Sequence, residues 1–208
     1  MNDSETALEH LQVIRSLMEK ATVYRSVTVP TAVMGGVIAI ATAVFLYLKD
    51  AQIATPAAMG AWLGSFVLIN VVNHALIWRT AQRAKEPYFS VGLSMALKAL
   101  IPALFVGGLL GMTLGFGPKS DLIGATLIWV TFYGLALMAT SGFSPRSLRL
   151  LGMVFTLIGA CGLAAHWSID LTELTSAHQL SALIMGLTFG VCHLVYAFCV
   201  RVSTNRAG

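Results

Sequence analysis

The sequence predicts an all-α, polytopic membrane protein in which six transmembrane helices form a compact bundle, preceded by an N-terminal cytoplasmic amphipathic helix. Hydrophobic residues make up 57% of the 208 residues and charged residues only 11%, whereas a soluble domain carries about 25% charged residues. Uncharged apolar runs long enough to cross about 30 Å of hydrocarbon occur six times. Basic residues gather between alternate runs, which fixes an orientation.

Residues 1–26 are expected to form the amphipathic helix. The segment from Ser4 to Arg25 lacks proline and glycine, and its apolar residues repeat at helical spacing. This stripe includes Ala7, Leu8, Leu11, Ile14, Met18 and Ala21. Such a helix either lies on the membrane as an anchor or docks a cytoplasmic protein or another copy of the chain through residues 4–25.

The transmembrane domain is expected over residues 27–200, followed by a short cytoplasmic tail over 201–208. Its connections are short, so consecutive helices should be antiparallel neighbours with no separate soluble domain. The predicted spans are 27–48, 56–78, 95–116, 122–143, 149–168 and 178–200.

The basic residues predict that both chain ends are cytoplasmic. Six spans place both ends on one side, and eleven of the thirteen Lys and Arg then lie on that side, leaving only Lys49 and Lys119 outside. We therefore expect a multi-pass protein of a bacterial inner membrane. The net charge of +4 forms no continuous basic face, so no nucleic-acid partner is predicted.

Glycines four residues apart are expected to pack helices closely, because small residues let backbones approach within a bilayer. Such pairs occur in three spans, with a triple in the third: Gly60 and Gly64, then Gly107, Gly111 and Gly115, then Gly186 and Gly190.

Polar residues inside the membrane are the main functional candidates. His74 and His193 lie at similar depths, and each has polar neighbours. The candidate cluster comprises Asn70, Asn73, His74, Lys98, His193 and Tyr196. Three hypotheses fit it: hydrogen bonding between helices as structural support, a path for a proton or small polar solute, or axial ligation of a b-type haem by two histidines.

A weaker candidate is a metal site near the last outer loop, at His166, Asp170, Glu173 and His178. Their spacing matches no compact metal motif, so neither a metal nor another cofactor is expected. The predicted spans contain no Asp or Glu for a carboxylate relay, and the chain has neither a phosphate-binding loop nor an H-E-x-x-H motif. The sequence thus favours a non-enzymatic scaffold, regulatory or docking protein, with a permease or channel as the first alternative and a haem redox protein as the second.

Overall fold

The computed structural model describes residues 29–85, 88–89, 91–169 and 175–205, and these residues contain helices and no strand. Six helices are long and apolar enough to span a membrane, so the predicted fold class is confirmed. The first helix is Val29–Leu48, and the short η1, Asp50–Gln52, follows it. The others are α2 (Thr55–Ala84), α3 (Val91–Phe116), α4 (Leu122–Ala139), α5 (Arg146–Ser168) and a last helix built from α6 (Ala177–Met185), the π-helical η3 (Gly186–Cys192) and α7 (His193–Asn205). The predicted amphipathic helix at residues 4–25 lies outside the described residues.

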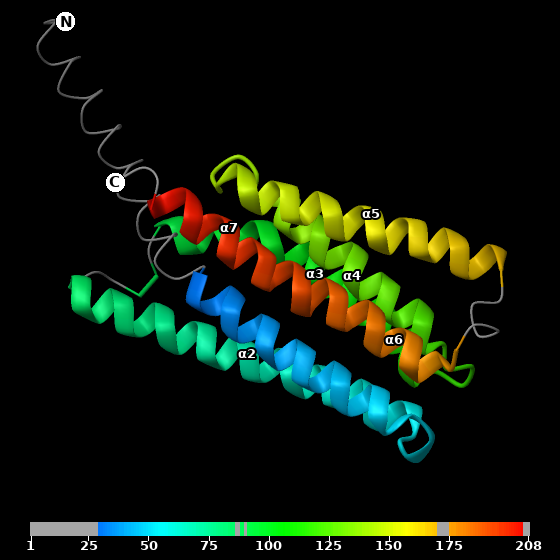
Figure 1. The fold of residues 1–208 in the computed structure, drawn as a ribbon. Helices are drawn as coiled ribbons and strands as arrows, with labels where there is room; N and C mark the ends of the chain where they lie inside the picture. The colour runs from blue at the N-terminus through cyan, green and yellow to red at the C-terminus, as the bar shows by residue number, and fades with distance from the viewer. Residues whose placement is uncertain (1–28, 86–87, 90, 170–174, 206–208) are drawn as a thin grey trace, which may run out of the picture.

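The helix α4 is the centre of the bundle and α2 lies at its edge (Figure 1). α4 packs against α3, α5 and α6. Within its apolar stretch 56% of the residues are buried, against 6% in α2. The first helix joins α2 to the bundle: the Thr31 hydroxyl donates to Oδ1 of Asn73, and the hydroxyls of Thr42 and Ser65 lie 2.7 Å apart.

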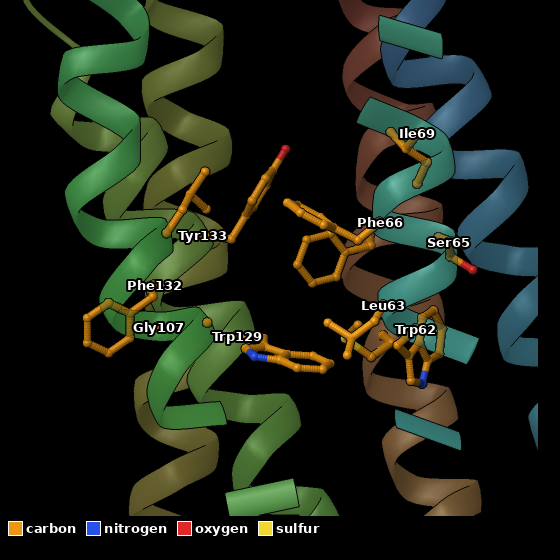
Figure 2. Close-up of a pocket in the computed structure, with 14 residues that line it drawn as sticks. Trp62, Leu63, Ser65, Phe66, Ile69, Gly107, Trp129, Phe132 and Tyr133 are labelled. Atoms are coloured by element: carbon orange, nitrogen blue, oxygen red, sulfur yellow. The ribbon is translucent and has the colours of Figure 1, made fainter. Parts of the chain in front are cut away.

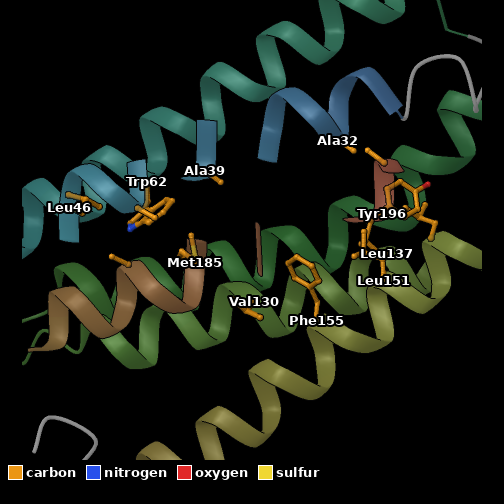
Figure 3. Packing of buried hydrophobic residues seen from close by; sticks show 14 of the residues in the cluster. Ala32, Ala39, Leu46, Trp62, Val130, Leu137, Leu151, Phe155, Met185 and Tyr196 are labelled. Carbon is orange, nitrogen blue, oxygen red and sulfur yellow. The ribbon is translucent and has the colours of Figure 1, made fainter. Parts of the chain in front are cut away.

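The buried core extends through the first helix, α2, α4, α5, α6 and α7 (Figure 3). Its largest fully buried side chain is Phe155 of α5, which shares this cluster with Val130 and Leu137 of α4 and Tyr196 of α7. α3 contributes only partly buried Leu100 to this cluster. The core is therefore built mainly by the other helices.

Local hydrogen bonds explain where several helices begin and end. Asp121 caps α4 by accepting the Gly124 amide at 2.8 Å, which satisfies one of the unpaired donors of a helix start. α4 ends at Ala139 rather than at the predicted residue 143. At this end the Thr140 hydroxyl donates to the Leu137 carbonyl at 2.7 Å, and the Thr140 carbonyl accepts the Phe143 and Ser144 amides in the turn that leads to α5.

The glycines of α3 and of the last helix make room for neighbouring side chains. At each of the five glycines that the four-residue pattern predicts in these two helices, a Cβ would lie less than 3.0 Å from a side-chain atom of another helix. The pairs are Gly107 with Phe132, Gly111 with Trp129, Gly115 with Met59, Gly186 with Ala43, and Gly190 with Ile40. On α3 the glycines thus receive bulky side chains, instead of bringing two backbones together.

Gly60 and Gly64 differ from the other predicted packing glycines. A Cβ at either position would meet nothing within 4 Å, so within the described part of the chain this pair packs against no other helix. The closest backbone approach lies instead between α4 and α5, where a Cβ on Gly134 would be 2.5 Å from the Thr156 nitrogen and one on Gly159 would be 2.6 Å from the Thr131 nitrogen. Gly134 of α4 and Gly152 and Gly159 of α5 therefore form this contact, and the four-residue pattern did not predict it.

Candidate functional site

A cavity of about 170 Å³ lies between α2 and α4, at mid-depth in the bundle. In Figure 2, Trp129 and Tyr133 of α4 face Leu63 and Phe66 of α2 across it. The rest of the wall comes from the first helix, α2, α3, α4 and the last helix: Ala39, Trp62, Ser65, Ile69, Leu104, Gly107, Gly108, Phe132, Met185 and Phe189.

The cavity wall is largely apolar, and its two hydroxyl groups are already hydrogen-bonded. The Ser65 hydroxyl donates to the Ala61 carbonyl at 2.9 Å and lies 2.7 Å from the Thr42 hydroxyl. The Tyr133 hydroxyl lies 2.8 Å from Nε2 of His193. What remains on the wall is largely the faces and edges of six aromatic rings together with aliphatic carbon, a surface suited to hydrocarbon.

Glycines on α3 give the cavity its shape. Gly107 accommodates Phe132, which lies against α3 rather than across the cavity. Gly108 also lines the cavity, and a Cβ there would meet nothing within 4 Å. A larger residue at position 108 would therefore occupy this space without first displacing a neighbour.

The predicted polar cluster separates into independent contacts. On α2, Asn70 donates to the Phe66 carbonyl at 2.9 Å, and Nδ1 of His74 lies 2.6 Å from the Tyr88 hydroxyl. Neither these two residues nor Asn73 lines the cavity. The number of residues from each histidine to the end of its helix predicts similar depths in the membrane for His74 and His193. It does not predict the direction in which each side chain points, because that direction depends on how the helix is rotated about its axis.

His193 lies in an aromatic environment at the end of the π-helical turn. Its ring centroid is 5.6 Å from that of Tyr133, 5.4 Å from that of Phe155 and 6.1 Å from that of Phe189. Its Nδ1 is buried without a hydrogen-bond partner. π-turns inside helices often occur at functional sites, and here the turn places Phe189 on the cavity wall.

The two remaining cluster residues occupy different surroundings. Tyr196 is buried in the core. The described ring contacts of His193 are with Tyr133, Phe155 and Phe189, and not with Tyr196. Lys98 is exposed on α3, six residues before cavity residue Leu104. The sequence did not indicate the tyrosine that bonds His193, because residues on α4 and α7 are 60 positions apart.

The two described metal candidates, His166 and His178, belong to separate pairs at the opposite end of the bundle from Lys98. His166 binds the Asp121 carboxylate through Nε2 at 2.9 Å. His178 lies 3.9 Å from Asp50, which also accepts a hydrogen bond from Ser176. The described residues contain no group of three or more metal-ligating side chains, while Asp170 and Glu173 lie outside the described residues.

Charge divides the two ends of the bundle. The described acidic residues are Asp50 and Asp121, both at the end where α2 and α4 begin. At the end where α2 finishes, every charged residue in the described part of the chain is basic: Arg79, Arg83, Lys85, Lys98, Arg146, Arg149 and Arg201. All of them are exposed, so this rim attracts anions.

Comparison with protein-family models, with curated proteins and with solved structures finds no match to this chain. A functional proposal therefore depends on the chain's own geometry, in which the cavity and the basic rim are the two features with a chemical preference.

Proposed function

We propose that this is a non-enzymatic membrane protein that holds the hydrocarbon part of a membrane-dissolved molecule in the cavity between α2 and α4. The observation that supports this role is the wall of that cavity, which consists of aromatic and aliphatic side chains with its hydroxyls already bonded. An empty space leaves wall atoms without dispersion partners. A hydrocarbon chain from the surrounding bilayer supplies those partners without requiring any polar group to lose water.

The size of the cavity limits the occupant. An apolar protein cavity of about 150 Å³ stays dry and takes up benzene, so about 170 Å³ accommodates a ring or a short run of chain. A transmembrane helix of a partner, about 10 Å across, would not enter it. The occupant is therefore a lipid-like small molecule.

The polar-solute and haem hypotheses draw less support from the geometry. A polar path would require Asn70, Asn73 and His74 on one cavity wall, whereas their described hydrogen bonds go to Phe66, Thr31 and Tyr88. A haem held by two histidines needs the two rings to face one another. The described contacts of His74 and His193 involve different side chains.

We further propose that the end of the bundle with Arg79 and Lys98 is cytoplasmic and that the membrane is a bacterial inner membrane. The excess of basic residues at that end supports this orientation. A docking or anchoring role for residues 4–25 stays a prediction from the sequence, and it is compatible with a cavity that binds lipid.

Filling the cavity tests the proposed function. Gly108→Phe places a ring in the cavity, and Gly64→Phe is the matched control, because a Cβ at either position meets nothing within 4 Å and Gly64 does not line the cavity. The proteins would be reconstituted in phospholipid vesicles, released in mild detergent and examined by native mass spectrometry. We expect the wild type and Gly64→Phe to retain a phospholipid that Gly108→Phe loses. Equal retention by all three would overturn the proposal.

A further inference from the structure

Two histidines at the acidic end of the bundle each face an aspartate. His166, near the end of α5, binds Asp121 at the start of α4. His178, near the start of α6, lies 3.9 Å from Asp50 in η1. Figure 1 shows that the turn containing η1 and the start of α6 lie at the same end of the bundle. The second pair therefore connects the last helix to the first hairpin, which consists of the first helix, η1 and α2.

His178 approaches the first hairpin with both ring nitrogens. Nδ1 lies 3.9 Å from Oδ1 of Asp50, and Nε2 lies 3.5 Å from the hydroxyl of Thr55 at the start of α2. Asp50 also accepts the hydroxyl of Ser176, which caps α6 by accepting the Gln179 amide. The turn of the first hairpin is thus attached to the start of α6 through a carboxylate, a hydroxyl and an imidazole.

His166 differs because only one of its ring nitrogens has a partner. Nε2 lies 3.0 and 2.9 Å from the two carboxylate oxygens of Asp121, while Nδ1 is buried without a hydrogen-bond partner. Since Nε2 carries the hydrogen that Asp121 accepts, a second proton would go to Nδ1 and find no acceptor. A second proton on His178 instead lets one nitrogen donate toward Asp50 and the other toward the oxygen of Thr55.

The charges around His178 identify Asp50 as its partner. In the described part of the chain, the other charged groups and histidines at this end are Lys49, Lys119, Asp121 and His166. Asp121 and His166 bind each other, and the Lys49 ammonium donates to Gln52 at 3.1 Å. Replacing Asp50 alone therefore separates its effect from that of Asp170 and Glu173, which lie outside the described residues.

The attachment of the first hairpin affects the cavity, because α2 forms the wall opposite α4. Only 6% of the apolar stretch of α2 is buried, so few contacts with other helices hold this wall in place. A firmer attachment of the hairpin to the last helix at the acidic end is therefore expected to slow the separation of α2 from α4.

From these contacts we propose that the first hairpin and the last helix form a pH-sensitive latch, in which protonation of His178 strengthens its hold on Asp50 and Thr55 and slows exchange of the cavity occupant. The effect on exchange rests on the proposed function. The folded chain gives the protonated ring two partners that the unfolded chain lacks. The added stability is therefore present at low pH and is lost as the pH rises through the range of about 5 to 8 in which histidine changes charge.

A double-mutant cycle at two pH values measures the latch itself. The wild type, Asp50→Asn, His178→Gln and the double variant are unfolded in mixed micelles at about pH 5.5 and pH 8, on either side of the usual titration of histidine. Asp50→Asn keeps an oxygen for the Ser176 hydroxyl. We expect the coupling of Asp50 and His178 to favour folding about two- to fivefold more at the lower pH, as for a partly exposed ion pair.

His166→Gln is the matched control, because it removes the other histidine of this end. The same cycle in the His166→Gln background should show the same difference between the two pH values. The inference is overturned by a coupling that is equal at both pH values, or by a difference that disappears with His166.

A kinetic measurement tests the effect on the cavity separately. Protein with Trp129 as its only tryptophan is mixed with vesicles of phospholipid brominated in the acyl chain, and the part of the quenching that Gly108→Phe abolishes is followed in time. We expect this quenching to be about twofold or more slower at the lower pH, in line with the coupling, and equally fast at both in His178→Gln. A rate independent of pH in the parent protein would overturn control by the latch but leave the proposed function intact. If Gly108→Phe abolishes no quenching, the proposed function itself is overturned.

Discussion

The hydroxyl of Tyr133 lies 2.8 Å from Nε2 of His193, which links α4 to the last helix directly after its π-helical turn. The ring of Tyr133 also lines the cavity, and Phe189 of the π-turn lines it too. This hydrogen bond therefore connects the two helices, α4 and the last helix, that contribute Tyr133 and Phe189 to the cavity wall. Because it lies among the rings of Phe155 and Phe189, water does not compete with it.

Tyr133→Phe tests the strength of this bond. The change keeps the ring on the cavity wall but removes the hydroxyl, so stability should fall by about 0.6 to 1.7 kcal/mol, as for other hydrogen bonds within membrane proteins. Denaturation in mixed micelles gives the free energy of unfolding. A double-mutant cycle with His193→Ala should show a coupling of similar size; additive effects would mean that the two residues do not support one another.

The contact between α4 and α5 predicts a strong position dependence for glycine substitutions. In Gly134→Ala the new Cβ would lie 2.5 Å from a backbone nitrogen of α5. Backbone cannot move aside as easily as a flexible side chain, so we expect a loss of about 1 to 3 kcal/mol in unfolding free energy. Gly60→Ala on the open face of α2 should change stability little. Equal losses in the two variants would contradict the packing described for α4 and α5.

Tryptophan fluorescence provides an independent probe of the cavity, because Trp129 lines it. In a variant that retains only this tryptophan, phospholipid brominated in the middle of its acyl chain should quench the indole emission. Gly108→Phe should lower that quenching, whereas Gly64→Phe should not. A single-tryptophan protein with Trp167, which is 72% exposed, should be insensitive to both changes. Unaltered quenching of Trp129 in Gly108→Phe would show that no chain enters between α2 and α4.

The number of spanning helices could be predicted from the sequence, because the bilayer limits which structures can cross it. A polypeptide segment that crosses hydrocarbon must form all of its backbone hydrogen bonds within the protein. The six apolar runs therefore predict six helices, and the structure contains them. Helix ends were less predictable: α4 ends at Ala139, four residues before the predicted end. Gly60 and Gly64 follow the same four-residue pattern as Gly107 and Gly111, yet they meet no neighbour.

The candidate site was less predictable, for a geometric reason. Hydropathy and helical rise give the depth of a residue in the membrane, but not the direction in which it points or the identity of the neighbouring helix. His74 and His193 were therefore matched by depth, whereas in the structure each lies beside its own tyrosine. The cavity was not predicted, because nothing in the sequence distinguishes Trp129 and Phe66 from other apolar residues of the spans. Their position on the cavity wall depends on how α2 and α4 pack together.

At the acidic end of the bundle, Asp121 stabilises two helices at once, and two substitutions separate its roles. Its carboxylate accepts the Gly124 amide at the start of α4 and binds Nε2 of His166 near the end of α5. Asp121→Asn preserves a good capping residue but removes the charge facing His166, while Asp121→Ala removes both interactions. Loss of a cap costs about 0.5 to 2 kcal/mol, so Asp121→Ala should be less stable than Asp121→Asn by about that amount in mixed-micelle unfolding. His166→Gln should lower the stability of the wild type but not that of Asp121→Ala, because in the second background the carboxylate is already absent; an equal loss in both would mean that His166 acts through another contact.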